Sequence, residues 1–210
     1  MRSERQRPPS DGAPPLVLVV DDEAPMRAAL NRLLLGAGLA VAQFDSGDAL
    51  LAAAPWQQGA CILLDMKMPG RSGLEVQSEL NRLGVTVPVI FLTGAGDVPK
   101  AVTAMHAGAA DFIEKPFDNA LLLERVKEAI ARGQQRRELD SERAEVRRRL
   151  ERLTARERQV LEQVVAGRTN KEIARILGAS HRTIEIHRTH VMEKMAASSL
   201  AGLVRMRLLW

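Results

Sequence analysis

Five polar side chains stand where apolar runs of the sequence end. They are Asp21, Asp22, Asp65, Thr93 and Lys115. A strand that ends in a polar residue presents that residue at the carboxyl edge of a parallel sheet, where open α/β folds place their sites. We therefore predict that these five side chains share one pocket.

Three carboxylates in one pocket would raise one another's pKa unless a cation lay among them. Oxygen ligands without a nearby histidine or cysteine favour Mg²⁺, so this ion is the predicted cofactor, bound by Asp21, Asp22, Asp65 and the backbone carbonyl of Lys67. A carboxylate beside Mg²⁺ can act as a nucleophile toward phosphorus. We predict that Asp65 is this nucleophile and that Lys115 and Thr93 stabilise the phosphoryl group as ammonium and hydroxyl.

The predicted elements alternate between strand and helix. Apolar runs predict strands over 16–20, 39–44, 60–64, 87–92 and 111–114, and the stretches between them predict helices over 24–35, 47–54, 74–83, 99–107 and 119–131. Three of the runs are almost continuously apolar, as strands covered on both faces are. The predicted fold class is α/β, with a doubly wound parallel sheet.

Four segments resemble the receiver domain of two-component response regulators. They are Val20-Asp21-Asp22-Glu23, Leu64-Asp65-Met66-Lys67-Met68-Pro69-Gly70, Leu92-Thr93-Gly94 and Glu114-Lys115-Pro116-Phe117. The resemblance implies a flavodoxin-like (CheY-like) five-stranded domain that a sensor histidine kinase phosphorylates on Asp65. It also implies that Asp22 and the Lys67 carbonyl bind Mg²⁺ directly, with Asp21 nearby or acting through water. Thr93 and Phe112 match the family's switch residues, and Lys115-Pro116 matches its cis peptide.

The charge of the chain is unevenly distributed. Residues 1–135 contain 13 Lys and Arg and 16 Asp and Glu, for a net charge of −3, whereas residues 136–210 contain 17 and 10, for a net charge of +7. The second part is therefore the expected site of nucleic-acid binding. Between the two parts, a charged helical stretch carries Leu139, Val146 and Leu153 at intervals of seven. It is either a short dimeric coiled coil or a solvated linker helix.

Three helices follow this stretch, and their ends carry capping signals. Thr154 with Glu157 predicts a capping box for a helix over 155–166, Asn170 is predicted to cap a helix over 171–177, and Ser180 a helix over 181–195. Gly178 lies in the short connection between the last two. This order predicts a helix-turn-helix.

The sequence around these helices resembles the LuxR-type DNA-binding domain. The segments are Leu153-Thr154-Ala155-Arg156-Glu157, Gly167-Arg168-Thr169-Asn170-Lys171-Glu172-Ile173-Ala174 and Arg182-Thr183-Ile184-Glu185-Ile186-His187-Arg188. The resemblance implies a small four-helix domain, and the candidate DNA-binding residues are Lys171, Arg182, Thr183, Glu185, Ile186, Arg188, Thr189 and Lys194. Among these, Glu185, Ile186 and Thr189 would face bases. For His181, His187 and His190 we expect no carboxylate or cysteine partner and hence no metal site.

Together the segments resemble a FixJ-type regulator with a tail over 1–14, a receiver domain over 15–132, a helical linker over 133–149 and a DNA-binding domain over 150–210. The expected partners are a sensor histidine kinase, double-stranded promoter DNA, RNA polymerase and a second copy of the chain after phosphorylation. We expect no enzyme activity beyond the receiver's own phosphotransfer and autodephosphorylation. Two alternatives remain, namely an unphosphorylated interaction module with constitutive DNA binding and a phosphate sink.

No stretch approaches the length of a transmembrane helix, and the single cysteine, Cys61, allows no disulfide within one chain. These features predict a cytoplasmic protein without a membrane partner.

Overall fold

The computed structural model describes residues 13–94 and 108–210. The helix predicted over 99–107 and most of the predicted N-terminal tail lie outside these residues. The chain divides between Gln135 and Arg136 into two compact units.

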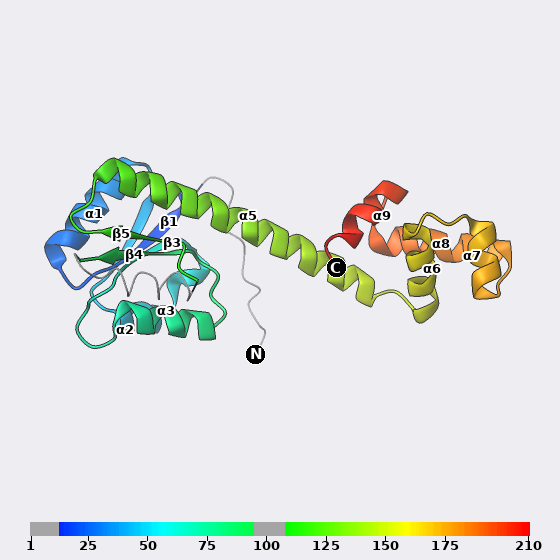
Figure 1. Cartoon of the computed structure of the whole chain (residues 1–210), viewed down its shortest axis with the longest axis horizontal. Coiled ribbons are helices and arrows are strands. Elements are labelled where there is room, and N and C mark those ends of the chain that lie inside the picture. Colours follow the sequence, from blue (N-terminus) through cyan, green and yellow to red (C-terminus); the bar gives the residue numbers. More distant parts are fainter. Residues whose placement is uncertain (1–12, 95–107) are drawn as a thin grey trace. The chain divides into compact units, whose positions relative to one another are not determined.

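The first unit is a parallel sheet with helices on both faces (Figure 1). Its strands are β1 (Leu16–Val20), β2 (Ala40–Phe44), β3 (Gly59–Asp65), β4 (Val89–Thr93) and β5 (Asp111–Glu114), and its helices are α1 (Ala24–Gly36), α2 (Gly47–Ala53), α3 (Gly73–Arg82), a short 3-10 turn over Pro55–Gln57 and the first part of α5 (Asn119–Glu151). The strand order is β2-β1-β3-β4-β5, with every neighbouring pair parallel. The predicted doubly wound α/β fold is confirmed.

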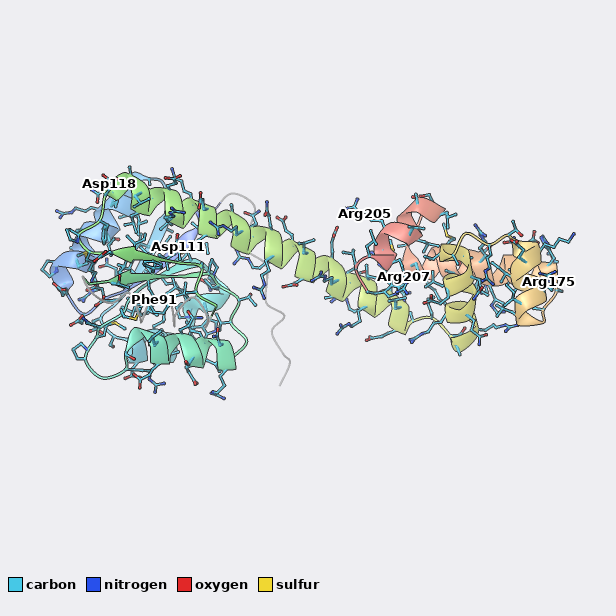
Figure 2. The ribbon with its side chains drawn as sticks, in the orientation of Figure 1. Phe91, Asp111, Asp118, Arg175, Arg205 and Arg207 are labelled. Carbon is cyan, nitrogen blue, oxygen red and sulfur yellow. The ribbon has the colours of Figure 1, made fainter. Side chains whose placement is uncertain are left out.

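Alternation along the strands divides the core into two layers. In β1, Val17 and Val19 pack into the layer that contains residues of α1 and α5, whereas Leu18 and Val20 pack into the layer that contains residues of α2 and α3. Figure 1 shows the same pairs of helices on opposite faces of the sheet. Phe91 of β4, labelled in Figure 2, is fully buried in the second layer. Continuous apolar strands are required because both faces are covered.

The second unit is helical and contains α6 (Ala155–Val165), α7 (Asn170–Leu177), α8 (His181–Met195) and α9 (Leu200–Arg207), together with the later turns of α5. Its core draws on all of these helices. The buried members are Val146, Leu153, Val160, Leu161, Val164, Ile173, Ile184, Val191, Met195 and Leu203.

The later turns of α5 therefore belong to the core of the second unit. Val146 is only 5% exposed and Leu150 packs against the same cluster, whereas Leu139 is 48% exposed. The Arg149 guanidinium donates to the Met195 carbonyl at 2.9 Å, which ties α5 to the end of α8. Two members of the predicted apolar stripe, Val146 and Leu153, are thus committed to packing within the chain. Packing with helices α6 to α9 begins before the predicted domain boundary at residue 150.

Side-chain caps begin α6, α7 and α8, because the first backbone N–H groups of a helix have no partner within it. Thr154 with Glu157 forms the predicted capping box at α6, and the Ser180 hydroxyl accepts from the Thr183 N–H at α8. The prediction for α7 is wrong by one residue, since Thr169 is the cap and forms a capping box with Glu172. Asn170 is the first residue of α7, and its side-chain oxygen accepts from Arg188 of α8 at 3.1 Å instead.

Gly73 permits a close approach of α3 to the strand end that carries Asp65. A Cβ atom at this position would lie 2.5 Å from the Asp65 carbonyl oxygen and 3.0 Å from the Phe91 ring. We expect Gly73→Ala to destabilise the protein by about 1–3 kcal/mol, as overpacking of a tight site does. Urea unfolding of the full chain measures this change.

Gly36→Ala is the matched control, because a Cβ there meets nothing within 4 Å. It should leave stability unchanged or raise it by at most about 1 kcal/mol, since alanine is the better helix former. Equal stability of the two variants would contradict the close contact at Gly73.

The buried Glu157 forms an ion pair with the partly exposed Lys194 of α8, whose ammonium lies 2.6 and 2.8 Å from the two carboxylate oxygens. The Lys194 ammonium lowers the pKa of Glu157 to about 2, with the Thr154 cap adding to the effect. A depressed pKa adds stability that is present above the unfolded value of 4.5 and is lost as the pH falls toward about 2. We expect Glu157→Gln to lower the free energy of unfolding by about 1–3 kcal/mol at pH 7. Urea unfolding should show this difference from the wild type disappear as the pH falls from 4.5 toward about 2.

Glu172→Gln provides the control, since Glu172 occupies the same capping-box position on α7 but is exposed. Glu172→Gln should lower the free energy of unfolding at pH 7 by less than Glu157→Gln does. A penalty for Glu157→Gln that stayed constant from pH 7 to pH 2 would show that the charge of Glu157 is not what stabilises this unit.

Candidate functional site

The strand order brings all five predicted pocket residues to one edge of the sheet. Asp21 and Asp22 follow β1, Asp65 ends β3, Thr93 ends β4 and Lys115 follows β5. In the parallel sheet, β1 lies between β2 and β3, so the connections leave in opposite directions from this point. Such a switch point leaves a crevice at the carboxyl ends of the strands, which is where ligands bind in this class of fold.

Three carboxylates gather in this crevice. Oxygen atoms of Asp21, Asp22 and Asp65 lie within 4.8 Å of one another. Asp21 is fully buried and Asp65 is 6% exposed, whereas Asp22 is exposed. The site therefore has two buried acids at its base and one acid on the solvent side.

Lys115 neutralises part of this negative charge. Its ammonium donates to Asp21 Oδ2 at 2.7 Å and to Asp65 Oδ1 at 3.2 Å. Burial raises the pKa of Asp65, the Lys115 ammonium counteracts that rise, and the charges of Asp21 and Asp22 add to it. The net direction is upward. Burial would lower the pKa of Lys115, but the two carboxylates that it contacts raise it above the ordinary value. This lysine is therefore charged at neutral pH.

Thr93 and Phe112 lie on the two strands beside the crevice. Thr93 is buried, and its hydroxyl donates to the Ile113 carbonyl of β5 at 3.4 Å. Phe112 precedes Ile113 on that strand and is 42% exposed. The hydroxyl is thus engaged with β5 in this structure, and the aromatic ring lies partly in solvent.

The loop after Asp65 leads directly into α3. Lys67 is exposed in this loop, and the role of its carbonyl as a metal ligand stays a prediction. Arg71 pairs with Asp48 of α2 at 3.0 Å, and Glu75 accepts from the Ser72 N–H at 2.8 Å in a capping box. The loop is therefore anchored to two helices just beyond the acidic cluster.

The residues of the cluster suit Mg²⁺. The three carboxylates offer only oxygen ligands, and burial together with the charges of Asp21 and Asp22 raises the pKa of Asp65 even with Lys115 in place. Asp22 is exposed, so an ion could retain several of its waters on that side, as Mg²⁺ does.

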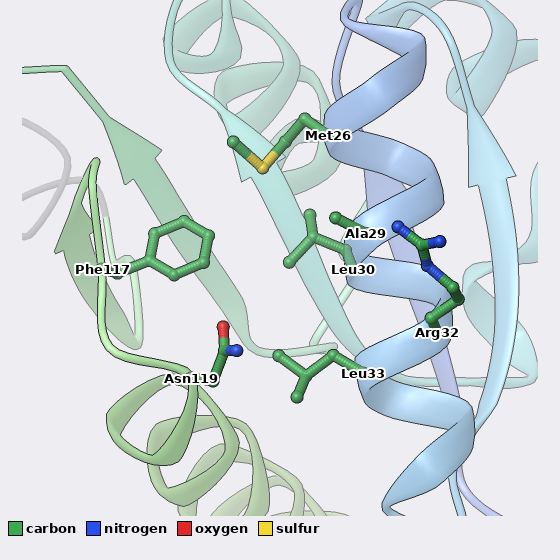
Figure 3. A pocket seen from close by; sticks show the side chains of 7 residues that line it. All are labelled: Met26, Ala29, Leu30, Arg32, Leu33, Phe117 and Asn119. Carbon is green, nitrogen blue, oxygen red and sulfur yellow. The ribbon is translucent and has the colours of Figure 1, made fainter.

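A pocket lies between α1 and the segment that follows Lys115 (Figure 3). Its apolar lining comes from Met26, Ala29, Leu30, Leu33 and Phe117, and Arg32 and Asn119 complete it. The neighbouring Arg27 donates to the Asp21 carbonyl at 2.7 Å, so α1 is joined to the strand end of the acidic cluster. The pocket is thus built from the same two segments that flank the crevice.

In the second unit, α7 and α8 form a helix-turn-helix. Gly178 ends α7 with a φ of 61°, a left-handed conformation that favours glycine. The exposed positions of α8 include Arg182, Thr183, Glu185, Ile186 and Thr189. Arg182, Glu185, Ile186 and Thr189 recur at intervals of three and four residues, which places them on one side of the helix.

The predicted DNA-binding residues differ in how free their side chains are. Lys171 on α7 and Arg182 and Ile186 on α8 are exposed, whereas Arg188 donates to Asn170 on α7. The Lys194 ammonium is bound by both carboxylate oxygens of Glu157. Lys194 therefore has an internal role that sequence reasoning missed, because its partner lies on another helix.

The expectation that the histidines lack a carboxylate partner is wrong. A carboxylate oxygen of Glu157 and a ring nitrogen from each of His187 and His190 lie within 4.8 Å of one another. In addition, His181 Nδ1 lies 3.6 Å from Glu185 Oε1. The spacing of three residues between His187 and His190 was a signal for a shared helix face, but it did not identify Glu157 on α6.

Two family models match the chain. Residues 17–127 match the response regulator receiver domain, and residues 151–207 match the bacterial regulatory proteins of the LuxR family. The chain belongs to the two-component response regulators of the FixJ class. As a member of this class, it is a transcription regulator with a receiver domain and a LuxR-type DNA-binding domain.

This response regulator is similar to curated relatives over most of its length. It is 50% identical to the transcriptional regulatory protein FixJ of Azorhizobium caulinodans, with 92% of each chain covered. It is 47% identical to FixJ of Rhizobium meliloti, over 91% of this chain and 94% of the relative.

Solved structures of response regulators are also similar to this chain. The low-resolution structure of the response regulator StyR is 38% identical, with a TM-score of 0.84 over 94% of this chain and all of that one. Full-length FixJ from B. japonicum is 40% identical, with a TM-score of 0.60 over 93% of this chain and 96% of that one.

Within the part of the chain that the structure describes, no helix has both the length and the apolar character that crossing a bilayer requires.

Lys115 and Mg²⁺ both neutralise the acidic cluster. We expect Lys115→Met to bind Mg²⁺ more tightly, by roughly tenfold or more, because the carboxylates lose their internal cation. In the wild type, the affinity should fall as the pH drops through the raised pKa of Asp65, since the proton competes with the metal. Isothermal titration calorimetry with MgCl₂ at several pH values measures both effects.

Lys127→Met removes an exposed lysine of α5 and serves as the control. Its Mg²⁺ affinity should match that of the wild type. Weaker binding by Lys115→Met than by the control would contradict a metal site made of these carboxylates.

Proposed function

We propose that a sensor histidine kinase phosphorylates this response regulator on Asp65, and that the phosphorylated chain dimerises, binds promoter DNA and activates transcription through contact with RNA polymerase. The observation that carries the proposal is the Lys115 ammonium, which lies within hydrogen-bond distance of Asp65 in an acidic crevice at the carboxyl edge of the sheet. An anionic product on Asp65 would meet a positive charge already in place.

In the proposed transfer, an oxygen of the Asp65 carboxylate attacks the phosphorus of a phosphohistidine. The new O–P bond forms as the P–N bond breaks, and its electron pair stays on the imidazole of the kinase. Asp21, Asp22 and Asp65 would hold Mg²⁺, which when bound would neutralise charge on the phosphoryl oxygens. The Lys115 ammonium pairs with one of these oxygens, and attack of water on the phosphorus later returns free Asp65 and inorganic phosphate.

Phosphorylation would be transmitted through Thr93 and Phe112. The Thr93 hydroxyl now donates to the Ile113 carbonyl at 3.4 Å, which is a long hydrogen bond. A phosphoryl oxygen is a stronger acceptor than a carbonyl, so the hydroxyl would turn toward it. The space that Thr93 leaves would accept the half-exposed Phe112 ring, which changes the surface of the receiver domain around β5.

The kinase would have to approach Asp65 from the carboxyl edge of the sheet. The apolar pocket between α1 and Phe117 flanks this edge and offers a surface to a protein that places its histidine over Asp65 (Figure 3). This placement supports the proposal that the phosphate donor is a protein partner.

In the second unit, α8 would enter the major groove of DNA. Arg182, Arg188 and Lys171 would contact phosphates, and Glu185, Ile186 and Thr189 would face base edges. An exposed isoleucine fits a thymine methyl group, and a glutamate can accept from a cytosine amino group. The net charge of +7 on residues 136–210 favours DNA over other partners of a helical unit.

The switch can be tested on the full chain in Mg²⁺ with beryllofluoride, which mimics the phosphoryl group on Asp65. We expect the mimic to convert the wild type to a dimer in sedimentation and to tighten its binding to a DNA duplex, with the dependence on salt roughly doubled because two units contact phosphates. Asp65→Asn should remain monomeric when the mimic is added, and its affinity for the duplex should not change.

Asp45→Asn, a change at an exposed aspartate outside the cluster, is the control and should respond as the wild type does. Identical dimerisation and DNA binding in wild type and Asp65→Asn would favour an unphosphorylated module with constitutive DNA binding. Normal regulation by a chain that lacks residues 150–210 would favour a phosphate sink.

A further inference from the structure

We propose that Glu157, His187 and His190 form a Zn²⁺ site between α6 and α8, separate from the acidic cluster of the receiver domain. One carboxylate oxygen and one nitrogen from each imidazole lie within 4.8 Å of one another. In particular, His190 Nδ1 lies 3.7 Å from Glu157 Oε1. Small side-chain adjustments would bring three such donors into one coordination sphere.

The donor set favours zinc over the ion proposed for the receiver domain. Two imidazoles and one carboxylate are a recurrent set of three protein ligands for Zn²⁺, with water in the fourth position. Mg²⁺ prefers an all-oxygen environment, so the two sites of the chain would select different metals.

The histidines are placed to accept an ion. His187 and His190 are three residues apart on α8, so their side chains lie on neighbouring positions of one helix face. His187 Nδ1 is buried and has no hydrogen-bond partner among the described residues, so no hydrogen bond competes with an ion for this nitrogen. His190 is half exposed and provides an entry path from solvent.

Lys194 already binds the carboxylate that the ion would need. Its ammonium contacts both oxygens of Glu157, and the Thr154 N–H donates to one of them. Zinc would therefore have to displace the ammonium. The side chain of Lys194 is 32% exposed, so it can swing into solvent without leaving a buried charge. The site thus predicts competition between a protein cation and a metal ion for Glu157.

Bound zinc would join α6 to α8, the helix that carries the candidate base contacts Glu185, Ile186 and Thr189. The ion would act within the second unit and would require neither Asp65 nor its phosphorylation. This proposal therefore stands or falls independently of the proposed phosphorylation switch.

The test is calorimetric titration of the tag-free full chain with ZnCl₂ in excess MgCl₂, which keeps the acidic cluster of the receiver domain filled. We expect one zinc ion per chain. His190→Gln should weaken this binding by at least roughly tenfold, the loss that even indirect supporting partners of a metal cause. His190 is half exposed, so the variant should fold, as circular dichroism would verify. Replacing zinc with Co²⁺ should give visible ligand-field absorption that His190→Gln loses.

His181→Gln is the matched control, because it changes a histidine of the same helix outside the cluster. It should bind zinc as the wild type does. Lys194→Met should bind zinc more tightly, because the competing ammonium is gone. The assignment would be overturned by a wild type that binds no zinc under these conditions, by equal binding in wild type and His190→Gln, or by Lys194→Met binding no more tightly than wild type.

Discussion

The first unit depends on a single lysine that neutralises two buried carboxylates. Asp21 directly follows β1 and Asp65 ends the neighbouring strand β3, and their charges could not both persist in a buried crevice without an opposite charge close by. The Lys115 ammonium supplies that charge from a segment 94 residues beyond Asp21 and 50 beyond Asp65. The sheet order, the loop into α3 and the position of α1 all serve to hold these three side chains at one edge.

The second unit also pairs a buried carboxylate with a lysine from another element. Glu157 is buried at the start of α6, and Lys194 of α8 neutralises it across the helix interface. The carboxylate also completes the cap of its own helix, so one side chain orients α6 and joins it to α8. Buried ionised groups of this kind specify how elements pack, because an alternative packing would leave a charge unpaired.

The long helix α5 shows how an apolar stripe can have more than one use. Leu139, Val146 and Leu153 are spaced as in a coiled coil, but Val146 and Leu153 are buried in the core of the second unit. A coiled coil between two chains would need Val146 and Leu153 at its interface, but these side chains already pack inside one chain. The later turns of α5 therefore act as part of the helical unit, and only Leu139 presents a largely exposed side chain from this stripe.

Local patterns in the sequence determined the strands, most helix ends and the set of residues at the sheet edge, because apolar periodicity and capping depend on neighbours a few positions away. Even there, the cap of α7 was misplaced by one residue, since both Thr169 and Asn170 are good cap residues. In the structure Thr169 caps the helix, and the Asn170 side chain accepts from Arg188 of another helix. The internal role of Lys194 and the approach of Glu157 to two histidines were decided by tertiary structure alone. Their partners are 30 or more residues apart, and no local pattern reports which faces of two helices meet.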